Sequence, residues 1–417
     1  MEVLRHLRAG VHGSVSVGAR LAGREQQLSR VFTFACRSMP ARSRFLAARF
    51  IALTLAAGCA GASPSSSPAP VATRGAGTTS APNSGATPLI QSVWPVRTRE
   101  QLDLWLHSYA MINPDSTLVP YFRRGYRERM TALRRQRGVT TLLDTNRERL
   151  VARIAIEPSL ATSGQFLPLY FTSWEQMRQV MDKFLAGNGS PASAGDQQTA
   201  AYFSLLSSAF PQGADREWLR LFIQSVDDES RKFYHDYWTT ELRARATVVA
   251  HVDSLWQRQW RPALQRYLNS TQQQGGELFL TLPLGGEGRT VQLAKNETDV
   301  AGPMPESIAE SDVVLYTLAH EVTGTIANAV IADNTTPADR RAGLTSRYEQ
   351  SAAVRAGALL LEKTIPAVLP GYMRFYLQQA GRTAPTDPRA AFLTAFAIPD
   401  AMRDAISRQL DVVLGGI

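Results

Sequence analysis

One segment of this chain reads Tyr316-Thr-Leu-Ala-His320-Glu321-Val-Thr-Gly324-Thr-Ile-Ala-Asn328. Around it, apolar residues recur at every fourth position, namely Val314, Leu318, Val322 and Ile326. This spacing predicts one helix over about 307–330, with a single apolar stripe turned towards the core. Ser307, followed three residues later by Glu310, is typical of a capping box at the start of such a helix.

Positions 320 and 324 lie one turn apart on the same face of the predicted helix. Zinc hydrolases place two imidazoles at this spacing, and the Glu after the first imidazole acts as general base. Here His320 and Glu321 are present, but Gly324 stands where the second imidazole is expected. A single residue therefore separates this segment from His-Glu-Val-Thr-His, and the functional interpretation depends on that residue.

The charge of the chain is concentrated at its front end. The chain of 417 residues has a net charge of +9, but residues 1–58 contain nine Arg and only two Glu. Residues 59–417 are left with an excess of two positive charges. A nucleic-acid-binding body would carry a strong basic excess. We therefore expect no nucleic-acid partner. The hydrophobic content of 44% is sufficient for a large core.

The front end has the features of a targeting sequence. Residues 39–58 join three Arg to a short apolar run, too short to span a bilayer, which leads to Leu55-Ala-Ala-Gly-Cys59. This segment resembles a bacterial lipobox, which implies that Cys59 is acylated and becomes the mature N-terminus. An ordinary signal peptide or a buried Cys is the alternative. Ala60 after the Cys indicates the outer membrane, with the body facing the periplasm or the surface. Residues 1–38 are interpreted as a leader created by a start site assigned too early.

Two regions of different composition follow. Residues 59–88 are rich in Ala, Ser, Pro and Gly, cannot bury enough apolar surface to fold, and are expected to form a tether. Residues 89–275 carry apolar residues at helical spacing and are expected to be a helical domain. Its aromatic residues could line a ligand groove, although core packing between helices is the more common role. They are Tyr202, Phe203, Trp218, Phe222, Phe233, Tyr234, Tyr237 and Trp238.

Residues 276–417 form the last predicted region. Alternating Leu residues, then Gly285-Gly-Glu-Gly288, then Thr290-Val-Gln-Leu293 predict a β-hairpin over 277–294. The Gly-rich turn lacks the Lys-Ser/Thr of a phosphate-binding loop and precedes a strand, which excludes that motif. A second helix is expected over 345–363, carrying Glu349, and further helices close the core. The whole fold is expected to be mainly α, with a small β-hairpin or sheet.

The order hairpin, His-Glu helix and second helix with Glu349 resembles the gluzincin (HExxH) group of zinc metallopeptidases. The resemblance covers about residues 277–365 and implies a zincin-like architecture. It implies His320 as the first zinc ligand, Glu321 as general base and Glu349 as the third ligand. It also implies that the strand before the helix binds a peptide. Gly324 is the position of the lost second ligand.

Three functions remain open on these grounds. The first is a degenerate peptidase domain kept as a binding or structural module for a peptide or protein. The second is an active, divergent zinc peptidase, because another His could complete the three protein ligands that a catalytic zinc needs. His251 is the least implausible donor. The third is a helical envelope scaffold unrelated to zincins, which would need no cofactor. Restoring an imidazole with Gly324→His is expected to rebuild a zinc site only if the resemblance holds.

Overall fold

The computed structural model of the chain describes residues 94–113 and 118–415. The predicted leader, the signal peptide, the tether and Cys59 lie outside these residues. Within the described part, no helix is both long enough and apolar enough to cross a membrane.

The structure is mainly helical with a small sheet, as the sequence predicts. The strands are β1 (Val96–Arg97), β2 (Leu278–Thr281), β3 (Arg289–Ala294) and β4 (Glu297–Pro303). The helices before the main strands are α3 (Glu100–Ile112), α4 (Tyr126–Gln136), α5 (Leu142–Ile156), α6 (Trp174–Ala186), α7 (Gln197–Ala209), α8 (Gly213–Glu229), α9 (His235–Ala244), α10 (Ala246–Leu255) and α11 (Arg261–Ser270). Those after them are α12 (Asp312–Val322), α13 (Gly324–Asn334), α14 (Pro337–Arg341), α15 (Leu344–Thr364), α16 (Leu369–Gln379), α17 (Arg389–Ala395) and α18 (Asp400–Gly415).

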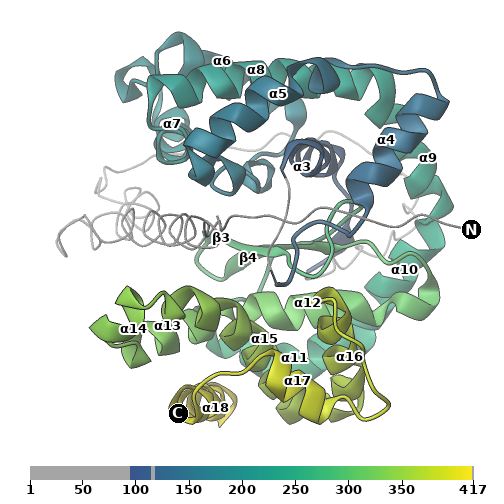
Figure 1. Cartoon of the computed structure of the whole chain (residues 1–417), viewed down its shortest axis with the longest axis vertical. Coiled ribbons are helices and arrows are strands. Elements are labelled where there is room, and N and C mark those ends of the chain that lie inside the picture. Colours follow the sequence, from purple (N-terminus) through teal and green to yellow (C-terminus); the bar gives the residue numbers. More distant parts are fainter. Residues whose placement is uncertain (1–93, 114–117, 416–417) are drawn as a thin grey trace, which may run out of the picture.

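The helices form two layers with the sheet between them (Figure 1). Helices α3 to α9 make the upper layer of that view, and α11 to α18 make the lower one. The buried carboxylate of Asp103 on α3 accepts the backbone N–H of Leu282, just after β2, at 2.7 Å. From the other side, α12 packs on β3 and β4. Helix α11 already belongs to the lower layer, so the layers divide before residue 261. The sequence instead predicts a domain boundary after residue 275.

The strand pairing differs from the predicted hairpin. The sheet order is β1-β2-β4-β3, so β2 and β3 are not neighbours, because β4 lies between them. β2 pairs with β4 in parallel, and the hairpin is formed by β3 and β4. Asn296 at its turn has φ 66°, in the left-handed region that Asn adopts more readily than most residues.

The prediction missed β4 because the strand does not show the alternation typical of a half-buried strand. Six of its seven residues are buried, from Thr298 to Pro303, so both faces are covered. A strand covered on both faces has no polar side to mark its period. Parallel pairing to β2 also requires a long connection, which sequence spacing alone does not indicate.

The predicted helix over 307–330 is divided into a short 3-10 turn (Ile308–Glu310), α12 and α13, which meet at Thr323. Side chains take carbonyls there that a continuous helix would use. Thr323 Oγ1 donates to the carbonyl of Ala319 at 2.8 Å, and Tyr267 donates its hydroxyl to that of Val322 at 2.8 Å. The expected Ser307 cap is also absent at the start of the 3-10 turn. The apolar stripe from Val314 to Ile326 is nevertheless buried, as predicted.

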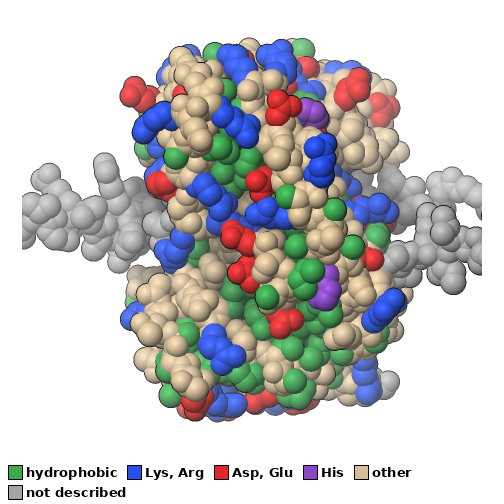
Figure 2. All heavy atoms as spheres, turned by 90° about the vertical axis from the view of Figure 1, so that its right-hand side faces the viewer, with side chains coloured by type: hydrophobic (Ala, Val, Ile, Leu, Met, Phe, Trp, Pro, Cys, Tyr) green, Lys and Arg blue, Asp and Glu red, His purple; other side chains and the backbone are tan. Residues whose placement is uncertain are grey.

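The aromatic residues of the upper layer mainly fill the core. Six of the eight are buried, namely Phe203, Trp218, Phe222, Phe233, Tyr234 and Tyr237. Figure 2 shows basic and acidic side chains interspersed over the face that includes α4 and α9, with hydrophobic side chains gathered in its lower half. This face has no field of a single sign that would attract a nucleic acid.

Candidate functional site around His320 and Glu321

His320 is held inside the lower layer by ring packing and one polar contact. Its imidazole is 6% exposed and stacks on Tyr376 of α16, with ring centroids 5.5 Å apart. Its Nδ1 lies 3.1 Å from Oε1 of Glu321. Its Nε2 is buried and has no hydrogen-bond partner among the described residues. One ring nitrogen is therefore satisfied, and the other is not.

Glu321 holds the Gly-rich loop between β2 and β3. Its Oε1 accepts the backbone N–H of Gly288 at 3.0 Å. The same loop is fixed elsewhere, because the Gly286 carbonyl accepts the Tyr376 hydroxyl at 3.2 Å. A Cβ on Gly288 would lie only 2.1 Å from the carbonyl oxygen of Ala301, so the close approach of loop and strand requires glycine. The carboxylate thus links α12 to the start of β3.

His320 and Glu321 behave as a buried ion pair. Burial alone would lower the pKa of His320, but the hydrogen bond and charge of Glu321 raise that pKa above its ordinary value. Burial likewise opposes ionisation of Glu321, yet the bond and charge of His320 and the Gly288 N–H lower the pKa of Glu321. The general base that the resemblance implies is therefore an ionised carboxylate with partners already in place.

Glu349 lies away from this pair. Helix α15 crosses α12 at Gly357, where an added Cβ would be 3.1 Å from the backbone nitrogen of His320. Glu349 is more than two turns earlier on α15, about 12 Å along the helix axis at the α-helical rise per residue. Its side chain is exposed, whereas His320 is buried. The structure brings His320 and Glu321 together and leaves Glu349 outside their environment.

Position 324 is open. A Cβ built on Gly324 would meet nothing within 4 Å, so no neighbouring side chain fills the space of a lost imidazole. The glycine begins α13, after the break at Thr323, instead of lying inside a continuous helix. The regular one-turn spacing on which the metal motif depends is therefore interrupted at this point.

The residues present do not fit a catalytic zinc. Such a site needs three protein ligands and an open position for water. No group of three or more His, Cys, Asp or Glu side chains in the described part of the chain is arranged to hold a metal ion. Neither Glu349 on α15 nor His251 on α10 therefore completes a set with His320. The imidazole also contacts Glu321, the residue that would have to act as base.

Sequence reasoning missed two features of the molecule. Glu287, inside the Gly-rich loop, is 8% exposed, and its charge also raises the pKa of His320. An acidic residue between glycines was the available signal. The other feature is a buried network in the upper layer centred on Glu229 and His107, which contact each other at 3.0 Å. Arg134 bonds both Glu229 and Asp144 in the same network, so its members come from α3, α4, α5 and α8, and no sequence spacing marks it.

No protein-family model, curated protein or solved structure matches this chain. Its function is therefore inferred from the chemistry of the folded body.

Proposed function

We propose that this protein is a cell-envelope lipoprotein whose body is a non-catalytic binding or structural module, built on a degenerate gluzincin-like helix pair. The anchor is the acylated Cys59 at the outer membrane. The observation that carries the non-catalytic part is the surroundings of His320, because no group of three or more His, Cys, Asp or Glu side chains in the described part of the chain is arranged to hold a metal ion. Without a metal-bound water, Glu321 has no activated nucleophile to serve as general base, and its Oε1 instead accepts the Gly288 N–H and contacts His320.

The His-Glu pair then has a structural purpose. It replaces a metal as the link between α12 and the loop before β3. Two further observations support descent from a peptidase-like arrangement, since α12 packs on β4 and also on α15. β3 is an edge strand of the sheet, and such an edge can pair with an extended peptide. A peptide or protein segment that pairs with the exposed edge of β3 is accordingly the class of ligand that we propose.

One observation favours an active, divergent zinc hydrolase as the second candidate. His320 Nε2 is buried without a hydrogen-bond partner in the described structure, and an unsatisfied imidazole nitrogen is a competent metal ligand. An active zinc site would require two further protein ligands to come within coordination distance of a zinc ion bound to this nitrogen. His251→Ala and Glu349→Ala should then each abolish zinc binding, whereas neither should change the metal content of a non-catalytic module.

Thermal unfolding in the presence of zinc tests the proposal. We expect the melting temperature of the wild type to be insensitive to equimolar zinc. Gly324→His should remain insensitive, because Glu349 is too distant to provide a third ligand. This expectation revises the one drawn from the sequence alone. A zinc-dependent rise in the melting temperature of Gly324→His would contradict the geometry described above and restore the expectation of a rebuilt zinc site.

A further inference from the structure

Two arginines of the described residues are more than nine-tenths buried, and they differ in their partners. Arg134 on α4 is 3% exposed and donates hydrogen bonds to Glu229 at 2.8 Å and to Asp144 at 2.7 Å. Arg355 on α15 is 8% exposed and has neither a hydrogen bond nor an ion pair within the described part of the chain. Buried arginines are almost always paired, so Arg355 points to a partner that is not part of the folded chain.

Solvent reaches the guanidinium of Arg355 in spite of this burial. The polar side-chain atoms that are both enclosed and unpartnered include Nε of Arg134 and Nε of Arg153. No nitrogen of Arg355 belongs to that set in the described structure, although none of them has a partner there. Each of these nitrogens therefore keeps some exposed surface, and an incoming acceptor can replace the water at it.

A second unpartnered donor lies one turn away on the same helix. Ser351 precedes Arg355 by four residues, so the two side chains lie on one face of α15. Ser351 is 3% exposed, and its hydroxyl has no hydrogen-bond partner among the described residues. Other buried helical serines, Ser108 and Ser225, donate to the carbonyl four residues earlier. The Ser351 hydroxyl, which is not enclosed either, is thus available to the same ligand as Arg355.

Both donors lie beside the start of α18, in the lower layer (Figure 1). Helices α15 and α18 pack together, and Lys363 donates to Asp411 at 2.7 Å. Eight residues earlier on each helix, Arg355 and Arg403 are close enough for their charges to interact. The two helices therefore run in the same direction, and Arg355 lies next to the first turn of α18.

The first turn of α18 provides backbone donors. This helix has 16 residues, and the N–H groups of Met402 and Arg403 donate to the Pro399 carbonyl at 3.0 and 3.1 Å. The N–H groups of Asp400 and Ala401 donate to no acceptor in the described part of the chain. Free N–H groups at the start of a helix carry partial positive charge and favour anions. The helix end and the α15 side chains therefore offer donors to one anion.

The acidic side chains near Arg355 are already paired with other arginines. Asp400 accepts from Arg403 at 2.7 Å, and its side chain is 83% exposed. Glu362 accepts from Arg389 of α17 at 3.0 Å. Burial lowers the pKa of Arg355, and the charges of Arg403 and Arg389 lower it further. The two carboxylates oppose this shift only in part, so the charge of Arg355 is not compensated.

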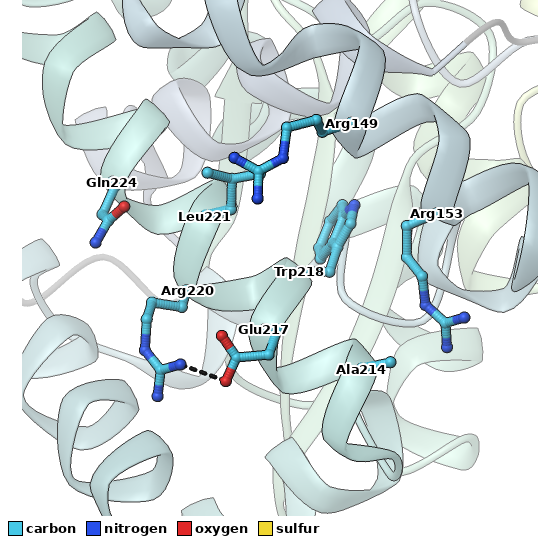
Figure 3. A pocket seen from close by; sticks show the side chains of 8 residues that line it. All are labelled: Arg149, Arg153, Ala214, Glu217, Trp218, Arg220, Leu221 and Gln224. Atoms are coloured by element: carbon cyan, nitrogen blue, oxygen red, sulfur yellow. Dashed lines mark hydrogen bonds and ion pairs between the residues drawn. The ribbon is translucent and has the colours of Figure 1, made fainter.

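Arginines elsewhere show the more usual arrangement. In a hollow of about 390 Å³ between α5 and α8, Arg220 is paired with Glu217 (Figure 3). Arg153, which lines the same hollow, donates to Asp215 at 2.5 Å. Clustered arginines are therefore not by themselves a sign of a ligand. Arg355 differs because it is buried, reached by solvent and unpaired.

We propose that Arg355, Ser351 and the first turn of α18 together bind an oxyanion. Carboxylate and phosphate groups both present two or more acceptor oxygens, which match the planar fork of arginine and leave an oxygen for a hydroxyl or a backbone N–H. The bound anion balances the charge of Arg355 and links α15 to α18. This site is separate from the edge of β3 and does not depend on the function proposed there.

Calorimetric titration of the full chain with inorganic phosphate, and separately with acetate, tests this site at constant ionic strength. We expect saturable binding of at least one of the two anions, at one site per chain. Ser351→Ala should weaken that binding about tenfold, because it removes a hydrogen bond to a charged ligand. Arg355→Met should abolish it. Arg408→Met, which removes the same charge from an exposed position of α18, should change the affinity less than about twofold.

Melting temperatures separate a ligand site from a structural role. In chloride buffer without oxyanions, Arg355→Met should melt higher than the wild type, because an unpaired buried charge is replaced by an apolar side chain. The anion that binds should raise the melting temperature of the wild type but not that of Arg355→Met. A lower melting temperature of Arg355→Met in chloride would reveal a stabilising partner inside the protein and overturn the proposal.

The two anions identify the chemistry of the ligand. Saturation by acetate identifies a carboxylate site, and saturation by phosphate alone identifies a phosphate site. The proposal is overturned if neither anion saturates the wild type. It is equally overturned if Arg408→Met weakens binding as much as Ser351→Ala does, because the effect would then be general electrostatic attraction.

Discussion

The contact between His320 and Glu321 predicts how the stability of the protein depends on pH. The ordinary pKa values are 4.5 for Glu321 and 6.5 for His320, so between pH 4.5 and pH 6.5 both side chains are charged in the unfolded chain as well. Because the pKa of His320 is raised on folding, its contribution to the free energy of unfolding is full below pH 6.5 and is lost as pH rises through the folded-state pKa. Because the pKa of Glu321 is lowered, its contribution is lost as pH falls below 4.5.

Glu321→Gln should therefore reverse the pH dependence around His320. The amide oxygen can still accept Gly288 N–H, but burial, already the largest single influence on the pKa of His320, is no longer outweighed by the bond and charge of Glu321 and lowers that pKa. Relative to the wild type, the variant should lose about 1–2 kcal/mol near pH 6 and recover part of this by pH 8. Urea unfolding at a series of pH values measures the difference. Equal curves for the two proteins would show that the pair contributes nothing to folding.

Gly324 gives a second prediction for a single residue. Its backbone has no positive φ, and a Cβ would meet nothing within 4 Å. Gly324→Ala should therefore raise the free energy of unfolding by about 0.5–1 kcal/mol, chiefly by restricting the unfolded chain. Gly288→Ala is the matched control and should destabilise, because its Cβ would lie 2.1 Å from the Ala301 carbonyl oxygen. A loss of stability in Gly324→Ala would show that position 324 is not open.

Among the elements, the helices of the upper layer depend on the network around Arg134. Removing one member of a buried ion pair leaves the other charge without compensation and typically costs about 3–5 kcal/mol. Arg134→Met should cost that amount in chemical unfolding. Arg220→Gln, which removes the exposed pair with Glu217, should cost less than about 1 kcal/mol. Similar losses in the two variants would mean that the network is not the main link between these helices.

Sequence patterns correctly predicted the helices that have a clear apolar period. The predictions from these patterns failed where contacts between distant parts of the chain override the period. The stripe from Val314 to Ile326 is buried as predicted, but the break at Thr323 depends on Tyr267, which is far away in sequence. β4 was missed because both of its faces are buried. At the candidate site, the pairing of His320 with Glu321 follows from their adjacency. The position of Glu349 does not, because it depends on where α15 crosses α12.

At the scale of the whole molecule, the described residues form two helical layers around a small sheet, and we propose that an acylated Cys59 anchors this body to a membrane. Cys59→Ser should remove acylation and release the protein from the membrane fraction, since stable anchoring needs the buried acyl chains. Fractionation followed by mass spectrometry of the mature N-terminus measures both effects. Unchanged processing and membrane association would contradict the lipoprotein assignment and leave the fold of residues 94–415 unaffected.

The zinc content of the purified wild-type protein tests the central claim most directly. We claim that His320 and Glu321 form a structural ion pair that holds the Gly-rich loop, and that they lack the partners of a catalytic zinc site. Elemental analysis after purification without chelators, and again after incubation with zinc and dialysis, should find far less than one zinc per chain. His320→Ala should not change this value. One tightly held zinc per chain in the wild type, lost in His320→Ala, would contradict the claim.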